Sequence, residues 1–165
     1  MSDIVLIAHN LRSTHNVGSL LRTGEGLGVS RVFLTGYSPY PLHEHDARLP
    51  HLAQKIDRQI SKTALAAEQS VAWEHRADIS EVIASLKAEG FVVAALEQTL
   101  GSLPLPDYKT PAKLALLVGR EVEGIEAEVL KACDICLEIP MFGQKESFNV
   151  VQAAAMALYH CRFQP

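Results

Sequence analysis

The sequence predicts an α/β fold with a mostly parallel sheet and helices on both faces. Short apolar runs of strand length recur along the chain and alternate with stretches of helical period. Two of these runs, residues 91–96 and 114–118, are continuously apolar, as expected for strands of a parallel sheet that is covered on both faces. The length of 165 residues favours one domain that spans residues 1–165.

The predicted strands and helices are marked by their hydrophobic spacing. Six runs of strand length are found at residues 4–8, 31–35, 71–74, 91–96, 114–118 and 135–139. Residues 78–89 predict a helix, because apolar residues recur at helical spacing between a capping residue, Asp78 or Ser80, and Gly90. Residues 36–51, rich in proline and histidine, lack a clear period and predict a loop.

The last predicted helix, residues 149–162, is apolar nearly all round. A helix without a polar face must be buried on more than one side. Two possibilities follow from this pattern: deep burial within the monomer, or a subunit interface.

Composition and charge limit the classes of function. The net charge of −4 argues against a protein that binds phosphate backbones mainly by overall charge. Residues 1–62 carry a net +2 and residues 63–165 a net −6, so any nucleic-acid contact is expected in the first of these parts; a chance imbalance is the alternative. Three cysteines form no closed disulfide framework and no apolar run is long enough to span a membrane, so we expect a cytoplasmic protein with no membrane contact.

The first motif is a helical segment around an arginine. Gly18, Gly24 and Gly26 lie inside residues 15–28, and each costs a helix about 1 kcal/mol relative to alanine. Gly18 and Gly26 lie four residues before and after Arg22, so all three share one helix face. Bare backbone beside a guanidinium can admit a phosphate or a sugar. Alternatively, the glycines allow tight packing on a strand, with Arg22 at the surface.

The second and third motifs follow strands. Residues 114–118 run into a turn that carries Glu121, and the carboxyl end of a parallel strand is where an open α/β sheet binds its ligand. A solvated turn residue is the alternative for Glu121. In residues 139–149, Ser147 is placed to cap the last helix, with Asn149 in its first turn; capping does not exclude a second role.

Together these motifs resemble a known family. Three short patterns occur in order: Asn16 with Arg22; Gly119-x-Glu121-x-x-Gly124; and Ile139-Pro-Met-x-Gly143 with Ser147-x-Asn149. They resemble the three motifs of the TrmH-like (SpoU) branch of the SPOUT RNA methyltransferases, in the same order and over nearly the whole chain. The resemblance implies a deep C-terminal trefoil knot that binds S-adenosylmethionine, and a homodimer through the C-terminal helix and knot region. Periodicity cannot show a knot, which is a rare exception to ordinary topology.

The resemblance also implies the roles of individual residues. The cofactor is expected against main chain at Leu96, Gly119, Ile139, Ser147 and Phe148, with phenylalanine at 148 where the family commonly has leucine. The reaction implied is transfer of a methyl group to a ribose 2'-hydroxyl of RNA. The expected catalytic residues are Arg22, Asn16, Glu121, Ser147 and Asn149. A free guanidinium has a pKa above about 12, so we expect Arg22 to hold an RNA phosphate and to polarise the hydroxyl; whether it also accepts the proton stays open.

The short chain favours tRNA as the substrate. Relatives that recognise large RNAs often carry an additional N-terminal RNA-binding domain, and we expect none here. A non-catalytic relative that binds RNA or S-adenosylmethionine is the alternative, but a structural descendant would have no physical reason to keep the full set of motif residues. Base methylation belongs to another branch with different motifs.

Two further clusters are weaker candidates. Cys133 and Cys136 resemble a redox or zinc pair, but a single pair beside a buried strand favours two core thiols. The histidines of residues 43–51 lack regular metal-ligand spacing, so we expect no metal site and a loop that faces solvent or contacts RNA.

Overall fold

The computed structural model describes residues 1–164 and contains one seven-stranded sheet in the order β3-β2-β1-β6-β4-β7-β5, in which every strand pair is parallel. The strands are β1 (Asp3–His9), β2 (Arg31–Thr35), β3 (Trp73–Arg76), β4 (Val92–Leu96), β5 (Leu103–Pro104), β6 (Lys113–Val118) and β7 (Ile135–Glu138). The helices are α1 (Thr14–Gly26), α2 (Pro50–Ala64), α3 (Ala67–Ser70), α4 (Ile79–Ala88), α5 (Ala127–Ala132) and α6 (Val150–Phe163), with the 3-10 turn η1 (Leu105–Asp107).

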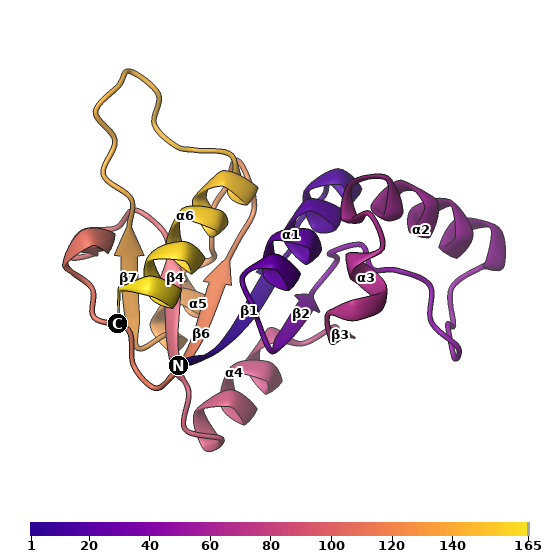
Figure 1. The fold of residues 1–165 in the computed structure, drawn as a ribbon, viewed down its shortest axis with the longest axis horizontal. Helices are drawn as coiled ribbons and strands as arrows, with labels where there is room; N and C mark the ends of the chain where they lie inside the picture. Colours follow the sequence, from indigo (N-terminus) through magenta and orange to yellow (C-terminus); the bar gives the residue numbers. More distant parts are fainter. Residues whose placement is uncertain (165) are drawn as a thin grey trace.

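Helices cover both faces of the sheet, as predicted. Alternate residues of β1 point to opposite sides: Ile4 and Leu6 pack with α1, α2 and α6, whereas Val5 and Ile7 pack with α4 and α5. Figure 1 shows α1 and α6 side by side over the central strands. The sheet therefore has two hydrophobic layers, and the central strands β1 and β6 are almost completely buried.

The predicted elements match with small shifts. Helix α4 begins after Asp78, whose carboxylate accepts a hydrogen bond of 2.7 Å from Ser80 N. Strand β3 begins two residues later than the predicted run 71–74. Helix α2 was not predicted; it begins at Pro50, a residue that suits the first turn of a helix because its missing N–H is not needed there.

Helix α1 forms in spite of its glycines, and Gly18 explains why. Ser13 caps the helix and accepts a hydrogen bond of 3.1 Å from Asn16 N. A Cβ atom on Gly18 would overlap Thr63 Oγ1 and the carbonyl oxygen of Ile60, both on α2. The prediction that Gly18 opens space beside Arg22 is therefore wrong, because Gly18 allows α1 to pack closely on another helix. Gly24 is buried against Val32 of β2 and Arg22 is exposed, as the alternative of packing on a strand predicts.

Helix α6 is buried on one side only within this chain. One face packs into the core along the whole helix through Val150, Ala154, Ala157, Leu158 and Cys161, but Met156, Tyr159 and Phe163 are 37%, 59% and 59% exposed. Deep burial of the whole helix within the monomer is therefore wrong. The outward apolar face is what the predicted subunit interface requires.

The predicted loop over residues 36–51 ends at residue 49, where α2 begins, and is held by its own side chains and by His75 of β3. The Arg48 guanidinium lies 3.6 Å from the centre of the Tyr40 ring and pairs with Asp46, and Tyr40 stacks on His75 at 4.1 Å. His43 and His45 are exposed, as the solvent-facing interpretation predicts. Within residues 1–164, the structure contains no cluster of three or more metal-ligating side chains.

Cys133 and Cys136 are half-buried and pack beneath α4 and β4. Burial raises the pKa of the Cys133 thiol to about 11, which keeps it protonated and unreactive at neutral pH. This arrangement agrees with two core thiols.

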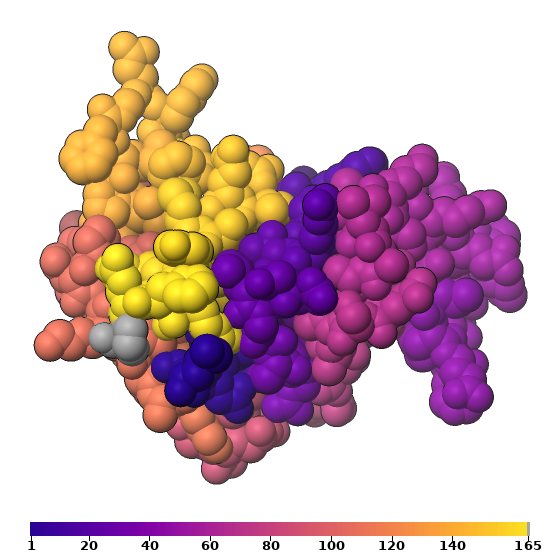
Figure 2. Space-filling view, viewed as in Figure 1, coloured from indigo at the N-terminus to yellow at the C-terminus, as the bar shows by residue number. Residues whose placement is uncertain are grey.

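The segment between β7 and α6 projects from the body of the molecule at the top of Figures 1 and 2. Its residues 142–149 are all exposed. The trefoil knot implied by the resemblance is a matter of chain threading, which the strand order does not decide, and it stays a prediction. No helix in the described part of the chain is long and apolar enough to span a membrane.

Candidate functional site

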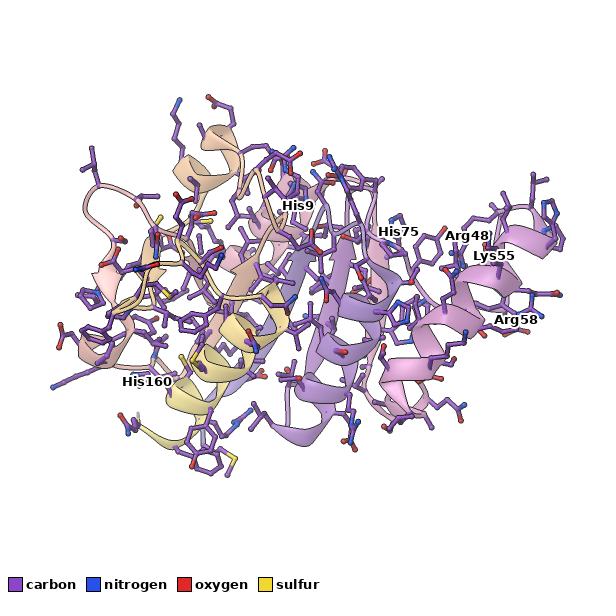
Figure 3. All side chains as sticks on the ribbon, turned by 90° about the horizontal axis from the view of Figure 1, so that it is seen from above. His9, Arg48, Lys55, Arg58, His75 and His160 are labelled. Atoms are coloured by element: carbon purple, nitrogen blue, oxygen red, sulfur yellow. The ribbon has the colours of Figure 1, made fainter. Side chains whose placement is uncertain are left out.

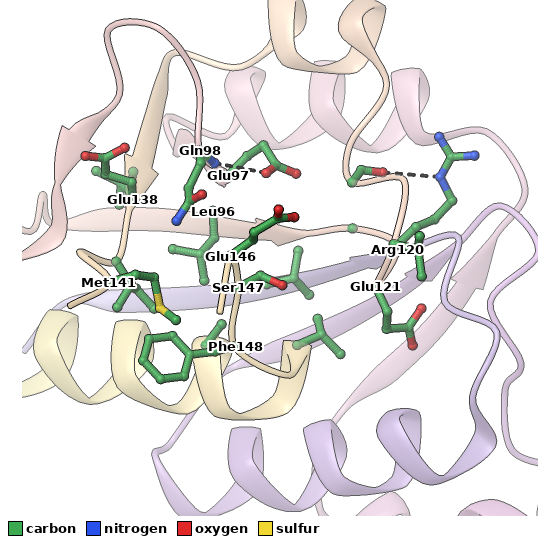
Figure 4. Close-up of a pocket in the computed structure, with 18 residues that line it drawn as sticks. Leu96, Glu97, Gln98, Arg120, Glu121, Glu138, Met141, Glu146, Ser147 and Phe148 are labelled. Carbon is green, nitrogen blue, oxygen red and sulfur yellow. Dashed lines mark hydrogen bonds between the residues drawn. The ribbon is translucent and has the colours of Figure 1, made fainter. Parts of the chain in front are cut away.

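A cavity of about 240 Å³ opens at the carboxyl ends of β4, β6 and β7 (Figure 4). This is the edge at which a parallel sheet presents its loops to a ligand. Six of the residues predicted for the site line this cavity: Leu96, Gly119, Glu121, Ile139, Ser147 and Phe148. The structure therefore brings the second and third motifs, which lie about 20 residues apart, to one site.

The turn after β6 is closed on itself and tied to β4. Arg120 Nε donates a hydrogen bond of 3.2 Å to the carbonyl oxygen of Gly124, and Ile125 N donates one of 3.2 Å to Glu97 Oε2. A Cβ atom on Gly119 would overlap the Ile125 side chain, so the glycine is needed for the turn itself.

Asn16 and Glu121 join the first motif to the second. Asn16 Nδ2 donates a hydrogen bond of 2.8 Å to Glu121 Oε1, across 105 residues of sequence. Asn16 lies in the first turn of α1, which the Ser13 cap fixes, and Glu121 lies in the turn after β6. The bond places the start of α1 at the mouth of the cavity, next to a carboxylate that lines it.

Arg22 lies apart from this pair. Six helical residues separate it from Asn16, which is about 9 Å along the axis and about 240° around it. Its side chain is exposed, is not part of the cavity lining, and forms no hydrogen bond or ion pair with the part of the chain that the structure describes. Its catalytic role stays a prediction.

The third motif departs from the prediction in one respect. Asn149, not Ser147, is the N-cap of α6: its side chain accepts a hydrogen bond of 2.9 Å from Val151 N, and its backbone is extended where the helix begins. Ser147 is too far from the helix start to cap it. Its hydroxyl is therefore free for a role in the cavity, which it lines beside Phe148.

Sequence reasoning missed the acidic character of the cavity. Three further carboxylates line it besides Glu121: Glu97, Glu138 and Glu146 (Figure 4). Arg120 is the basic residue among the lining residues. Glu97 directly follows the predicted strand 91–96, so its position at a strand end was the signal that could have identified it.

A buried polar cluster behind the turn was also missed. His9 Nδ1 lies 2.9 Å from Thr35 Oγ1, and His9 Nε2 lies 3.3 Å from Glu126 Oε2. Glu126 Oε1 accepts a hydrogen bond of 2.9 Å from Asn10 and lies 3.3 Å from the Arg120 guanidinium. Burial is the main cause that lowers the pKa of His9. The cluster connects the end of β1 to Arg120 and so supports the turn that carries Glu121.

Comparison with known proteins places the chain in a family. The model of the SpoU rRNA Methylase family matches residues 3–159, and the chain belongs to that family. Over 161 residues it is 30% identical to the tRNA (guanosine(18)-2'-O)-methyltransferase TARBP1 of Mus musculus, covering 96% of this chain and 9% of the mouse protein. The next curated relatives, staphylococcal proteins assigned to the TrmH family, are covered over 56% of their length, so the chain spans about half of them or less.

Solved structures share the fold. The SpoU methyltransferase AviRb from Streptomyces viridochromogenes, in complex with the cofactor AdoMet, superposes with a TM-score of 0.82 at 20% identity, over 99% of this chain and 58% of that one. A structure described as giving insights into the 2-OH methylation of C/U34 on tRNA superposes with a TM-score of 0.79 at 21% identity, over 97% of this chain and 94% of that one. These likenesses establish the SPOUT methyltransferase fold.

Proposed function

We propose that this protein transfers a methyl group from S-adenosylmethionine to a ribose 2'-hydroxyl of RNA. The observation that carries the proposal is the hydrogen bond between Asn16 and Glu121 at the mouth of the cavity. It brings the first motif to the site where residues of the second and third motifs already meet. A chain that only kept the fold would have no physical need for this convergence.

The cavity residues fit the cofactor. Its walls combine apolar side chains such as Leu137 and Phe148, which suit an adenine ring, with main chain at the ends of three strands. The surrounding carboxylates, Glu97, Glu138 and Glu146, suit a ligand that carries a sulfonium and an ammonium charge. Leu96, Gly119, Ile139, Ser147 and Phe148 would hold it.

When bound, the cofactor supplies an electrophilic methyl group, and the protein must present the acceptor hydroxyl. The cofactor would give up the methyl group to the hydroxyl oxygen and remain as a neutral thioether, and the hydroxyl proton would pass in the end to solvent. Glu121, held by Asn16, and Ser147 orient the target nucleotide at the mouth of the cavity. Arg22 mainly holds an RNA phosphate and polarises the hydroxyl, since its planar group can donate two hydrogen bonds to one phosphate; whether it also accepts the hydroxyl proton is left open.

We infer further that the substrate is tRNA and that residues 1–165 act as one methyltransferase domain in a homodimer. The mouse relative is a tRNA methyltransferase by name, one structural neighbour concerns methylation of tRNA, and that neighbour is covered over nearly its full length. The exposed face of α6 supports the dimer, since its aromatic side chains Tyr159 and Phe163 are both 59% exposed and lie side by side. The three free cysteines support a reducing, cytoplasmic location.

Calorimetric titration with S-adenosylmethionine tests the cofactor, and transfer of labelled methyl groups to unfractionated tRNA tests the reaction. We expect binding, and transfer that Arg22→Lys reduces without weakening cofactor binding, because the planar two-pronged group is lost. If S-adenosylmethionine does not bind, the proposed activity is wrong and the non-catalytic alternative is favoured.

The substrate is tested by deleting the gene and mapping 2'-O-methyl groups in total tRNA and ribosomal RNA. Loss of one tRNA site supports the proposal, whereas loss of a site in ribosomal RNA alone contradicts tRNA as the substrate.

A further inference from the structure

Helix α2 carries a row of basic side chains on its outer face. His51, Lys55, Arg58 and Lys62 are spaced by four, three and four residues and are all exposed. At 100° per residue they lie within about 60° of one another around the helix axis, and the row is about 16 Å long. We call these four residues the α2 stripe.

Folding of the helix does not account for the α2 stripe. The buried residues of α2, namely Ala53, Ile60 and Ala64, lie on the opposite side, about 180–220° around the axis from His51. The acidic residue of the helix, Asp57, lies next to the buried side, about 240° from His51, and accepts a hydrogen bond of 2.8 Å from Leu42 N. Within the part of the chain that the structure describes, none of the four basic side chains forms an ion pair.

The α2 stripe leads toward the candidate site. Thr63, the residue after Lys62, donates a hydrogen bond of 2.9 Å to the carbonyl oxygen of His15. The residue after His15 is Asn16, which binds Glu121 at the mouth of the cavity. Gly18 packs directly on α2, so the stripe keeps a fixed position relative to this pair. Figure 3 places Lys55 and Arg58 at the end of the molecule away from His160.

We propose that the α2 stripe binds the sugar–phosphate backbone of the RNA substrate outside the methyl-transfer cavity. The proposal rests on the proposed function, because the row of charges ends beside the pair that would orient the target nucleotide. A regular row of cations suits a polymer with regularly spaced phosphates. The apolar face of α2 is already packed on α1, so the helix has no such face to insert into a lipid surface.

The α2 stripe also explains how an acidic chain can bind RNA. The whole chain has a net charge of −4, but residues 50–64 contain three Lys or Arg and a single Asp. A local cationic surface attracts phosphates in spite of the overall charge, because charges farther away than about 10 Å are largely screened at physiological salt. The α2 stripe is therefore a local cationic surface on a chain that is acidic overall, in addition to the contacts of the target nucleotide at the cavity.

The test compares two variants that remove the same charge. The first is Lys55→Gln with Arg58→Gln and Lys62→Gln. The control is Lys109→Gln with Lys113→Gln and Lys131→Gln, three exposed lysines outside α2. The dissociation constant for unfractionated bacterial tRNA is measured between 50 and 200 mM salt, conditions that expose charge contacts. Calorimetry with S-adenosylmethionine is run on each protein.

We expect the α2 variant to bind tRNA about tenfold more weakly at 150 mM salt, with a salt slope reduced by about 2, since each lost phosphate contact lowers the slope by about 0.7. The control variant and the charge-preserving variant Lys55→Arg, Arg58→Lys and Lys62→Arg should bind as the unchanged protein does. Unchanged tRNA binding by the α2 variant, or an equal loss in the control, overturns the proposal. The same proteins are also tested for binding to vesicles of anionic lipid. If the α2 variant loses binding to the vesicles but not to tRNA, the proposal is overturned as well.

Cofactor binding separates this proposal from the proposed function. If S-adenosylmethionine binds all variants equally while the α2 variant binds tRNA as before, only the α2 stripe is wrong. If no variant binds the cofactor but the α2 variant loses tRNA binding, the α2 stripe binds phosphates and the proposed methyltransferase activity is wrong.

Discussion

The hydrogen bond from Asn16 Nδ2 to Glu121 Oε1 connects residues on α1 and on the turn after β6. Its acceptor is a carboxylate, and a hydrogen bond to a charged group contributes more than one between neutral groups. Around it, Ser13 fixes the start of α1, and Glu97 holds the far end of the turn through Ile125 N. Both partners are therefore positioned by their own backbone before any ligand arrives.

A double-mutant cycle measures the coupling free energy between Asn16 and Glu121 in methyl transfer. Asn16→Ala, Glu121→Ala and the double variant should each slow methyl transfer, with a coupling of about 1.5–3 kcal/mol, the range for a hydrogen bond to a charged group. Cofactor affinity of Asn16→Ala should stay unchanged, since Asn16 does not line the cavity. Strictly additive effects would show that the two residues act independently.

His9 makes stability depend on pH. Burial lowers its pKa below the ordinary value near 6.5, although attraction to Glu126 acts in the opposite direction and Arg120 acts in the same one. The unfolded chain then binds more protons than the folded one as the pH falls through 6.5, so stability is lost on the acidic side. We expect the free energy of unfolding to fall between pH 7.5 and 5.5, and His9→Gln to have a shallower dependence.

The exposed His45 supplies the control for this experiment. His45→Gln should leave the pH dependence of the free energy of unfolding as it is in the unchanged protein. An equal change in both variants would mean that burial of His9 is not the cause.

The packing of α1 on α2 fixes the position of α2 and therefore of the α2 stripe. Their contact depends on Gly18, which lies directly against the backbone of Ile60 and the side chain of Thr63. Gly26, at the other end of α1, has no atom within 4 Å of the place where a Cβ would lie. The two glycines have the same helical cost but different surroundings, so they can be compared directly.

Gly18→Ala should destabilise the protein by about 1–3 kcal/mol, because overpacking outweighs the better helix propensity of alanine. Gly26→Ala should be neutral or stabilise it by up to about 1 kcal/mol. Both values come from denaturant unfolding. A stabilised Gly18→Ala would mean that α2 shifts without cost.

Two residues at the start of α6 are expected to have different roles: Asn149 stabilises the helix, whereas Ser147 takes part in methyl transfer. Asn149→Ala removes the helix cap and should cost about 1 kcal/mol of stability. Ser147→Ala should leave the free energy of unfolding nearly unchanged, since Ser147 is exposed, but should reduce methyl transfer. The opposite order of the two stability effects would restore Ser147 as the cap.

The molecule as a whole has a cavity at one end of its parallel sheet, a cationic helix on one flank and an apolar helix face on the other. On that face Tyr159 and Phe163 lie with ring centres 4.7 Å apart and are largely exposed. Aromatic side chains bury large areas and are enriched at subunit interfaces. The α2 stripe and the α6 face belong to different surfaces, so one copy can bind RNA while it contacts a second copy.

Sedimentation should therefore give about twice the chain mass of 18.0 kDa. Tyr159→Lys with Phe163→Lys should shift the protein to the monomer, because two charges would be buried unpaired at the interface. Tyr37→Lys with Leu49→Lys, two exposed apolar residues elsewhere, should leave the mass unchanged. A monomer in the unchanged protein would contradict the dimer.

The sequence by itself determined the class of fold and most of the site. A strand that is apolar on both sides needs cover on both sides, which helices on the two faces of a parallel sheet provide. Motif residues that follow such strands then meet at one edge of the sheet. Helix α2 escaped prediction because its apolar residues are few and follow a loop. Ser147 was mistaken for the cap because Ser and Asn cap helices equally well and only backbone geometry distinguishes them.

Only the tertiary structure decided which residues meet across long distances in the chain. The bond between Asn16 and Glu121 depends on how α1 packs on the sheet, and the close packing at Gly18 depends on a helix that the pattern did not show. The acidic lining of the cavity and the row of cations leading toward it are likewise products of packing. Sequence spacing fixes neighbours within one helix or strand, whereas contacts between elements depend on the shapes of all the side chains that separate them.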